Sequence, residues 1–158
     1  MAENKHPLGE QPLWRQAAVH TLHSALVLKA LVEDHLQEQT GLLLADNEAM
    51  LNLAAEPLRM SDIADRLIVS RGGTTKVIDR LETLGYVRRL PDPEDRRATI
   101  VEITDAGRNA LVEAKVVIDE VLEATWGKHA TDEESAVVID VMERVLADHL
   151  EDHHPERG

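Results

Sequence analysis

The chain has 158 residues, which is enough for one domain of ordinary size. It contains no cysteine, and this excludes disulfides, thiolate nucleophiles, thiol redox sensing and cysteine-based zinc sites. The formal charge of −13 argues, as an average, against nucleic acid as a partner, and the three aromatic residues are too few to build stacking platforms for single-stranded nucleic acid.

The first twelve residues are polar, contain two prolines and lack the apolar segment of a signal peptide. No apolar run elsewhere approaches the length that is needed to span a bilayer. We therefore expect residues 1–12 to be an N-terminal extension of a soluble, cytoplasmic protein that has no membrane partner.

Two helices are predicted next. Residues 13–39 contain neither proline nor glycine and carry several leucines near one stripe, and Gly41 is expected to end this long helix. A shorter helix is predicted over residues 48–55, with Asp46 or Asn47 as its N-cap.

Two more short helices follow. Pro57 stops the preceding helix, and Ser61 is the expected N-cap of a helix over residues 62–67. After a tight turn at residues 68–70, apolar side chains recur with the i, i+4, i+7 spacing of an amphipathic helix. These apolar residues are Val77, Leu81 and Leu84.

The hydrophobic period changes from 3.6 to 2 after Gly85. Residues 86–90 and 98–103 are predicted to form two strands, because they are rich in β-branched and apolar side chains. Proline and acidic residues between them, at 91–95, indicate a turn. The segment is therefore predicted to be a β-hairpin with a charged tip.

The rest of the chain is predicted to be helical. One helix opens at residues 104–107 and runs to about residue 126, and a last helix covers residues 131–150. Residues 151–158 are expected to be a flexible tail. The fold class is therefore mainly α with a small β-hairpin (α+β).

The basic residues are concentrated around the short helices and the hairpin. Residues 66–97 contain eight basic and five acidic side chains, a local charge of +3, whereas the other 25 acidic and nine basic side chains carry −16. The order helix, tight turn, helix and hairpin over residues 60–103 is that of a winged helix-turn-helix, which binds DNA. Arg71, Lys76 and Arg80 lie off the predicted apolar face, where they can contact phosphates and base edges.

Three motifs in the correct order and spacing carry a resemblance to a known family: DRLETLGYVRR at residues 79–89, DPEDRRA at 92–98 and ITDAG at 103–107. With the surrounding stretch, residues 60–107, they resemble the MarR family of bacterial and archaeal transcriptional regulators. The resemblance implies a cytoplasmic protein that is associated with the nucleoid when it is bound to DNA.

The resemblance also implies an architecture and partners. Residues 13–45 and 108–150 would supply the helices that hold a homodimer together, and residues 46–107 would form the winged helix-turn-helix lobe. The dimer would bind a roughly palindromic operator in double-stranded DNA. Many members of the family also respond to a small-molecule effector, so a ligand-responsive repressor is the expected function.

Site residues are carried over from the family to matching positions. Arg71, Thr74, Thr75 and Lys76 fall where the recognition helix meets the major groove. Asp95 is expected to help hold the wing, and Arg97 to enter the minor groove beside Arg96. The residues that we expect at the DNA interface are Ser70, Arg71, Gly72, Thr74, Thr75, Lys76, Arg80, Asp95, Arg96 and Arg97.

The predicted recognition helix begins with two adjacent glycines, Gly72 and Gly73, after a cap at Ser70. Each glycine costs about 1 kcal/mol against alanine in a helix interior. Two explanations remain open. Bare backbone lets phosphate or base edges approach the helix N-terminus closely, or the glycines relieve packing against the preceding helix.

Other candidate sites are weaker. Trp14 is expected to pack in the core or in a dimer interface, or else to join Arg15 and His23 in a cleft that binds an anionic aromatic effector. The chain has eight histidines, which we expect to be ordinary surface residues. A metal-responsive regulator that uses histidines such as His20 and His23 remains an alternative, and no resident metal or cofactor is expected.

Two other function classes are weighed against a DNA-binding regulator. A winged helix can also serve as a protein–protein interaction module that binds no DNA. An all-helical enzyme is the second rival, but none of the common nucleophile, phosphate-binding or zinc-protease motifs occurs in the chain. The protein is therefore predicted not to be an enzyme.

Overall fold

The computed structural model describes residues 11–67, 71–93, 95 and 98–152. The chain divides into two compact units, and the boundary between them falls after Val121. Because each unit is compact by itself, they are described in turn.

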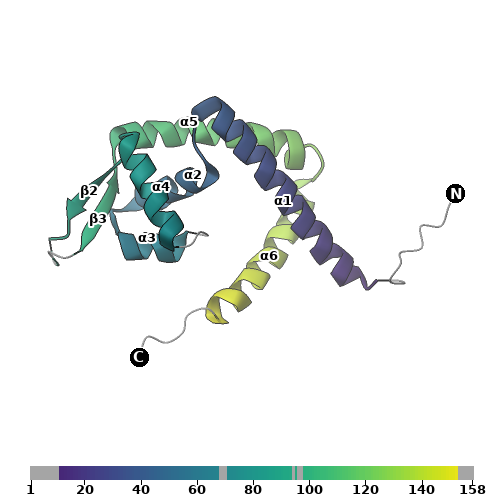
Figure 1. Cartoon of the computed structure of the whole chain (residues 1–158). Helices are drawn as coiled ribbons and strands as arrows, with labels where there is room; N and C mark the ends of the chain where they lie inside the picture. The colour runs from purple at the N-terminus through teal and green to yellow at the C-terminus, as the bar shows by residue number, and fades with distance from the viewer. Residues whose placement is uncertain (1–10, 68–70, 94, 96–97, 153–158) are drawn as a thin grey trace. The chain divides into compact units, whose positions relative to one another are not determined.

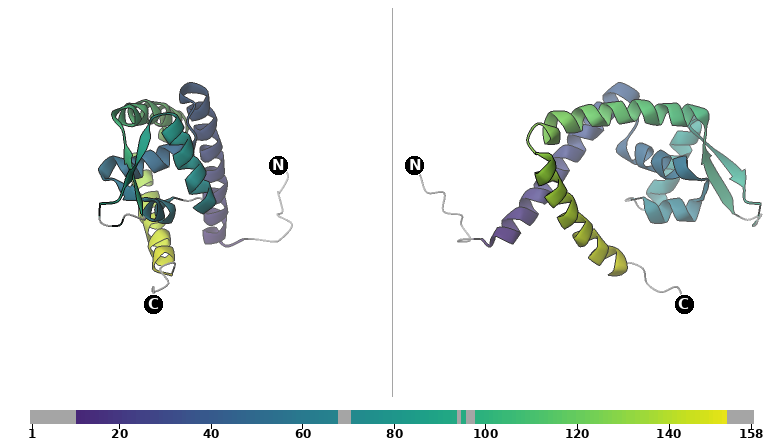
Figure 2. Two further views of the ribbon diagram at one scale, coloured as in Figure 1. Left: turned by 60° about the vertical axis from the view of Figure 1, so that its left-hand side comes forward. Right: turned by 180° about the vertical axis from the view of Figure 1, so that it is seen from behind.

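The first unit contains five helices and three strands among its described residues (Figure 1). In chain order they are α1 (Leu13–Thr40), α2 (Leu44–Ala55), β1 (Leu58–Arg59), α3 (Met60–Arg66), α4 (Arg71–Thr83), β2 (Val87–Pro91), β3 (Thr99–Ile103) and α5 (Asp105–Leu122). Both views of Figure 2 show α2, α3 and α4 beside the small sheet. This is the mainly helical winged fold that the sequence predicts.

Helices α1 and α4 both end at glycines in the left-handed region, Gly41 with φ +73° and Gly85 with φ +75°. The Gly41 N–H donates to the Gln37 carbonyl at 3.0 Å, which satisfies a carbonyl that the helix leaves open. The end of α1 at Gly41 was expected from the sequence and is confirmed.

Helix α2 begins earlier than predicted, at Leu44 instead of Glu48. Asp46 and Asn47 therefore lie inside its first turn and are not N-caps. Asp46 is nevertheless bonded to the residue before the helix, because its carboxylate accepts the Leu43 N–H at 2.8 Å. The fully buried Leu42 anchors the chain in the core just before this helix, and that long-range packing was not visible in the local sequence.

Helix α3 also begins earlier than predicted, at Met60, so that Ser61 lies in its first turn and is not its N-cap. The Ser61 hydroxyl donates to the side chain of its neighbour Asp62 at 3.2 Å. The two residues before α3 form strand β1, which the sequence analysis missed because a two-residue strand has no recognisable periodicity.

The three strands form one antiparallel sheet in the order β1-β3-β2. Strand β3 is central, with Leu58 of β1 opposite Val101 and Val87 of β2 opposite Ile103. The β2–β3 hairpin is the predicted wing, and it projects from the helices at the left of Figure 1.

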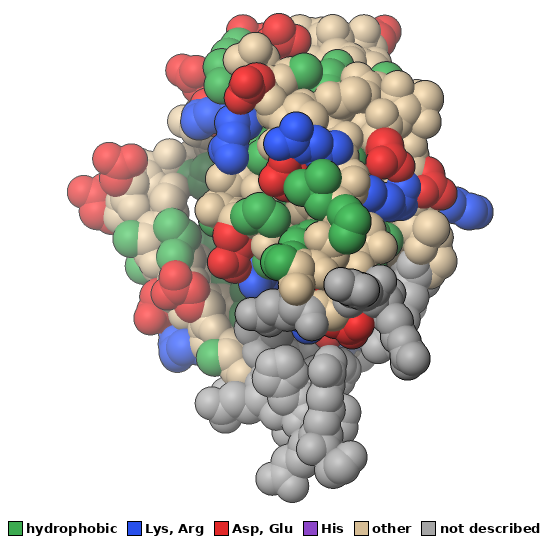
Figure 3. All heavy atoms as spheres, turned by 90° about the vertical axis from the view of Figure 1, so that its left-hand side faces the viewer, with side chains coloured by type: hydrophobic (Ala, Val, Ile, Leu, Met, Phe, Trp, Pro, Cys, Tyr) green, Lys and Arg blue, Asp and Glu red, His purple; other side chains and the backbone are tan. Residues whose placement is uncertain are grey.

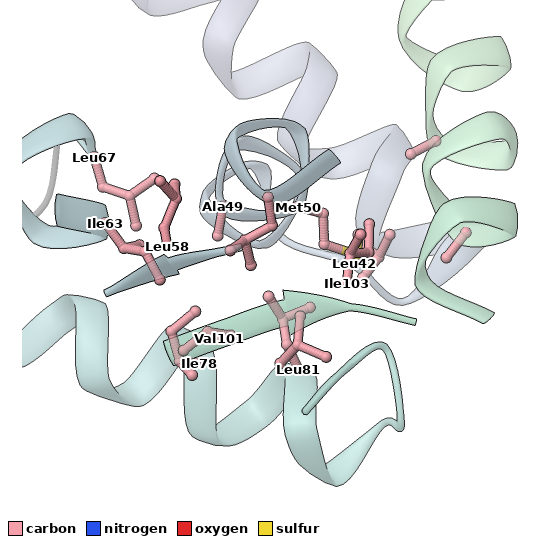
Figure 4. Close-up of a cluster of buried hydrophobic side chains, with 14 of the residues drawn as sticks. Leu42, Ala49, Met50, Leu58, Ile63, Leu67, Ile78, Leu81, Val101 and Ile103 are labelled. Atoms are coloured by element: carbon pink, nitrogen blue, oxygen red, sulfur yellow. The ribbon is translucent and has the colours of Figure 1, made fainter. Parts of the chain in front are cut away.

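The core is a single cluster of Leu, Val, Ile, Ala and Met side chains, as expected for a chain without phenylalanine. Ile78 and Leu81 of α4 pack towards Val101 of β3 (Figure 4). The predicted apolar face of α4 is borne out in part, because Leu81 is buried and Val77 packs against this core. Thr74, Ile78 and Leu81 are buried, whereas Leu84 lies beyond the helix and is 44% exposed.

Helix α5 begins in close contact with the loop before β2. A Cβ atom at Gly107 would lie 2.2 Å from the Tyr86 carbonyl oxygen and 2.8 Å from Cγ1 of Ile103. Thr104 fixes this junction, because its hydroxyl donates to the Gly85 carbonyl at 2.7 Å and accepts the Gly107 N–H at 3.1 Å. Glycine is thus required where the first turn of α5 meets the sheet.

The second unit consists of the π-helical turn η1 (Glu123–Gly127) and helix α6 (Asp132–Asp152). Thr131 and Glu134 form a reciprocal capping box at the start of α6, with N–H···O distances of 3.2 and 2.9 Å. The indole N–H of Trp126 donates to the Ser135 hydroxyl at 3.1 Å, which joins η1 to α6. Over the described part of the chain, no helix has the length and apolar character to cross a membrane.

Candidate nucleic-acid interface

The first two turns of α4 expose several described residues to solvent. Gly72, Thr75 and Lys76 are exposed. Lys76 makes no ion pair with any residue that the structure describes. Ser70, Arg96, Arg97 and the side chain of Arg71, all expected at the DNA interface, lie outside the described part of the chain.

Gly72 faces open space. A Cβ atom built on it would have no described atom within 4 Å. Packing therefore does not require a glycine at this position, in contrast to Gly107. Among the described residues, no contact with the preceding helix explains Gly72, and close approach of a ligand to its bare backbone stays a prediction.

Thr74, by contrast, does not face solvent. Its exposed fraction is 1%, and it shares the buried face of α4 with Ile78 and Leu81. The expectation that Thr74 meets a DNA groove therefore does not fit its position in this fold. Threonine is small enough, and carries enough apolar surface, to be buried when its hydroxyl is hydrogen-bonded.

Most of the described basic side chains near the recognition helix are already paired with acidic ones. Arg66 lies 3.5 Å from Glu56, Arg88 pairs with Glu102, and Arg89 lies 2.7 Å from Asp79. Figure 3 shows the same pattern, with Lys and Arg side chains beside Asp and Glu on the face around the hairpin. Of the eight basic residues in this segment, at least Arg66, Arg88 and Arg89 are therefore already paired within the fold.

Arg89 of β2 is the most heavily engaged of these side chains, because it also pairs with Glu82 of α4. Burial alone would lower the pKa of Arg89, but its hydrogen bonds to Asp79 and Glu82 outweigh that effect and raise the pKa. Arg89 therefore stays charged, and its ion pairs join strand β2 of the wing to helix α4.

Arg80 is also engaged within the fold. Its guanidinium lies 3.3 Å from the buried carboxylate of Asp46 and donates to the carbonyl of Gly41. We expected Arg80 to contact DNA, but the structure directs its guanidinium to the junction of α1 and α2. The sequence showed only that Arg80 lies off the apolar stripe, and this is true of both arrangements.

The loop end of the wing is held by an aspartate that the sequence analysis missed. Asp92 is 4% exposed, and its carboxylate accepts a hydrogen bond from Nε of Arg59 in β1 at 2.5 Å. The expected wing residue, Asp95, is exposed, and its N–H lies 3.4 Å from the Asp92 side chain. The partners Arg59 and Asp92 are 33 residues apart, so no local motif could have paired them.

The residues expected to contact an effector lie near the start of α1 and are exposed or partly exposed. Trp14 is 72% exposed and His23 is exposed on the same helix, while Arg15 is partly exposed. Trp14 is therefore not a core residue of the single chain, which leaves its expected role in a dimer interface or effector cleft open. Among the described residues, no group of three or more His, Asp or Glu side chains could hold a metal ion.

Comparisons with known proteins agree with this fold. A family model described as MarR family matches residues 41–98. The HTH-type transcriptional regulator PrsX of Escherichia coli is 32% identical over 95 residues, which are 60% of this chain and 56% of that protein. The multiple antibiotic resistance protein MarR of E. coli is 31% identical over 80 residues, 51% of this chain and 56% of that protein. The chain thus spans just over half the length of these curated relatives.

Solved structures match over nearly the whole chain. Sco3205, a MarR family transcriptional regulator from Streptomyces coelicolor in complex with DNA, has a TM-score of 0.77 at 22% identity and covers 95% of this chain and 96% of its own. BldR from Sulfolobus solfataricus has a TM-score of 0.74 at 26% identity, covering 88% and 99%. Members of this family are transcription regulators and not enzymes. The fold, the match of the MarR family model over the winged helix and these relatives together make the chain similar to the winged-helix transcriptional regulators of the MarR family.

Proposed function

We propose that this protein is a homodimeric regulator that binds a roughly palindromic operator in double-stranded DNA and represses transcription until an effector is bound. The observation that carries the proposal is the exposed first part of α4, where Gly72, Thr75 and Lys76 face solvent. Support also comes from relatives that are named transcriptional regulators, and from Sco3205, which was crystallised in complex with DNA.

The proposed mode of binding follows from the physical properties of α4. The N-terminus of a helix carries a partial positive charge, which favours phosphate. Lys76 can pair with a phosphate because no described acidic side chain neutralises it. The proposed major-groove contacts are Ser70, Arg71, Gly72, Thr75 and Lys76, and the proposed minor-groove contacts are Arg96 and Arg97.

A second copy of the chain is the proposed partner of the terminal helices. Helix α1 carries a set of strongly exposed apolar side chains, as does α6. On α1 they include Leu13, Trp14, Leu22 and Leu26, and on α6 they include Val137, Ile139, Val145 and Leu146. Apolar surface of this kind indicates an interface, and two-fold symmetry is the commonest solution. Two winged helices would then meet half-sites about 10 base pairs apart.

The proposed effector is a small molecule that contacts Trp14, Arg15 and His23 in the dimer. An indole face beside a guanidinium suits an anionic aromatic compound. We propose a cytoplasmic location, since the operator would be chromosomal.

The function is tested by titrating the protein with duplex DNA from upstream of its own gene at several salt concentrations. Because phosphate contacts release counterions, the logarithm of the affinity should fall linearly with the logarithm of salt. Lys76→Ala should weaken binding and reduce the slope by about one. Lys115→Ala, which removes an equal charge from α5, is the matched control and should leave the slope unchanged.

Two results would contradict the proposal. A duplex affinity without any salt dependence would rule out phosphate contacts. The absence of duplex binding would instead support a protein–protein interaction module. Arg97→Ala is expected to cause a marked loss of affinity, and unchanged duplex binding by this variant would contradict the proposed minor-groove contact.

A further inference from the structure

The first turn of α2 contains a carboxylate that is completely removed from solvent. The exposed fraction of Asp46 is 0%. Its Oδ2 accepts the Leu43 N–H at 2.8 Å, whereas Oδ1 is buried without a hydrogen-bond partner among the described residues. A buried carboxylate with an unsatisfied oxygen is costly, so its presence calls for an explanation other than stability.

Arg80 connects this carboxylate to the recognition helix. It lies in the last turn of α4, with Nη1 3.3 Å from Oδ2 of Asp46 and Nη2 donating to the Gly41 carbonyl. Gly41 ends α1 and Asp46 lies in the first turn of α2. One side chain of α4 therefore contacts both sides of the junction between α1 and α2.

The contact between Arg80 and Asp46 is better suited to fixing the angle of α4 than to stabilising the fold. Burial raises the pKa of Asp46, and the Leu43 hydrogen bond and the charge of Arg80 oppose that effect without cancelling it. Apolar side chains of similar volume often stabilise a site as well as a buried ion pair does. Apolar packing is not directional, however, so it does not fix the angle between two helices. Arg80 can fix this angle, because it contacts both the Gly41 carbonyl and the Asp46 carboxylate.

A small tilt of α4 at Arg80, in its last turn, would displace its first turn. Gly72 precedes Arg80 by eight residues, which corresponds to about 12 Å along a helix axis. A tilt of about 5° at Arg80 would then move the first turn by about 1 Å, enough to disturb hydrogen bonds to base edges.

We propose that Asp46 is a positioning residue for DNA recognition, which acts through Arg80 to hold α4 at a set angle to the α1–α2 junction. Because α1 carries the proposed dimer surface, the same link would set the spacing between the two recognition helices of a dimer. This inference rests on the proposed DNA-binding function and deepens it.

The experiment compares Asp46→Asn, Arg80→Gln and Arg80→Lys in the full-length protein. Asp46→Asn is nearly isosteric and keeps an oxygen for the Leu43 amide, but it removes the charge that holds Arg80. Asp62→Asn is the control, because it removes a carboxylate from an exposed first turn, that of α3. Affinity is measured for duplex DNA from upstream of the gene and for an unrelated duplex, across salt concentrations.

A positioning role predicts a loss of specific affinity alone. Asp46→Asn and Arg80→Gln should weaken binding to the specific duplex roughly tenfold, in the range expected when a coupled site is perturbed. The salt slope and the affinity for the unrelated duplex should stay unchanged, because no phosphate contact is lost. Arg80→Lys should recover part of the affinity, and Asp62→Asn should behave as wild type.

Other binding results would overturn the inference. A salt slope reduced by about one in Arg80→Gln would mean that Arg80 itself contacts phosphate. Unchanged specific affinity in Asp46→Asn would mean that the link does not position α4.

Amide hydrogen exchange supplies a readout that does not depend on DNA. Asp46→Asn should speed exchange in α4 while the amides of the central strand β3 stay protected, and equal protection of α4 in both proteins would overturn the inference. If the wild type bound no duplex, the proposed function would fail while the exchange of α4 still tested the positioning role. If Asp46→Asn did not fold, Arg80→Gln would test the same contact. The Arg80 side chain is 36% exposed, so its replacement leaves no buried cavity.

Discussion

The carboxyl group of Asp46 is buried in a protein whose other described acidic side chains lie mostly at the surface. Burial has the largest effect on its pKa and raises it above the ordinary value of 3.8. The folded state therefore holds the proton more tightly than the unfolded state does. Its contribution to stability is fully present below pH 3.8 and is lost as the pH rises through the raised pKa.

The direction of this pKa shift leads to a prediction for Asp46→Asn, which replaces the ionisable carboxyl group with an amide that does not titrate. The free energy of unfolding of wild type relative to the variant should be highest at acid pH and fall as the pH rises above 3.8. Each unit by which the pKa is raised corresponds to about 1.4 kcal/mol. Urea unfolding of both proteins over a pH series measures the difference. A difference that instead grew in favour of wild type would show that attraction by Arg80 exceeds the cost of burial.

Individual residues also show where charge counting fails. The cluster of basic residues correctly marked the winged helix, but Arg66, Arg88 and Arg89 are paired with acidic neighbours. Only contact in three dimensions decides whether a cation is available to a phosphate. Lys76 is distinguished from these arginines by its environment and not by its sequence pattern.

The elements of the winged helix are joined by a few contacts that tolerate little change. The start of α5 meets the loop before β2 at Gly107, where any side chain would collide with the Tyr86 carbonyl. Arg59 and Asp92 join β1 to the end of β2, and Arg89 joins β2 to α4. The wing is therefore held at its loop end by Arg59 and in the middle of β2 by the contacts of Arg89.

Gly107→Ala is predicted to destabilise the protein by about 1–3 kcal/mol, the usual cost of overpacking, because the obstacle is backbone and cannot rotate away. Gly72→Ala is the matched control, since its Cβ would meet open space. It should leave stability unchanged or raise it by up to about 1 kcal/mol. Urea denaturation followed by circular dichroism measures both variants. Equal stability of the two would contradict the assigned close contact at Gly107.

At the scale of the whole molecule, several large apolar side chains of α1 are exposed to solvent. Leu22 and Leu26, exposed at 59% and 57%, are one helical turn apart and thus on one face. Burial of each side chain against a second copy would contribute about 1.5–3 kcal/mol.

The double variant Leu22→Glu/Leu26→Glu should therefore weaken dimerisation by at least about a hundredfold and reduce operator affinity with it. Sedimentation velocity measures the oligomeric state. Leu51→Glu on α2 is the control, because Leu51 is equally exposed, at 57%, but lies in the winged-helix lobe. A dimer that survived the double change intact would place the interface elsewhere.

Most elements could be predicted from the sequence because their signals are local. Helical periodicity, the glycine after α1, the change of period at the hairpin and the family motifs all lie within a few residues of the structures that they specify. The same local signals marked the first turn of α4 as the candidate recognition site. They could not show that Thr74 is buried or that α2 starts at Leu44, since these depend on packing against distant segments.

By itself, the sequence determined the helices, the wing, the resemblance to the MarR family and the region of the candidate DNA interface. Only the tertiary structure decided which residues of that region face solvent and which hold the fold together. Arg80 and Asp92 show the reason. Their partners, Gly41 and Arg59, are 39 and 33 residues away in the chain, so their roles arise only when the folded chain brings those segments into contact.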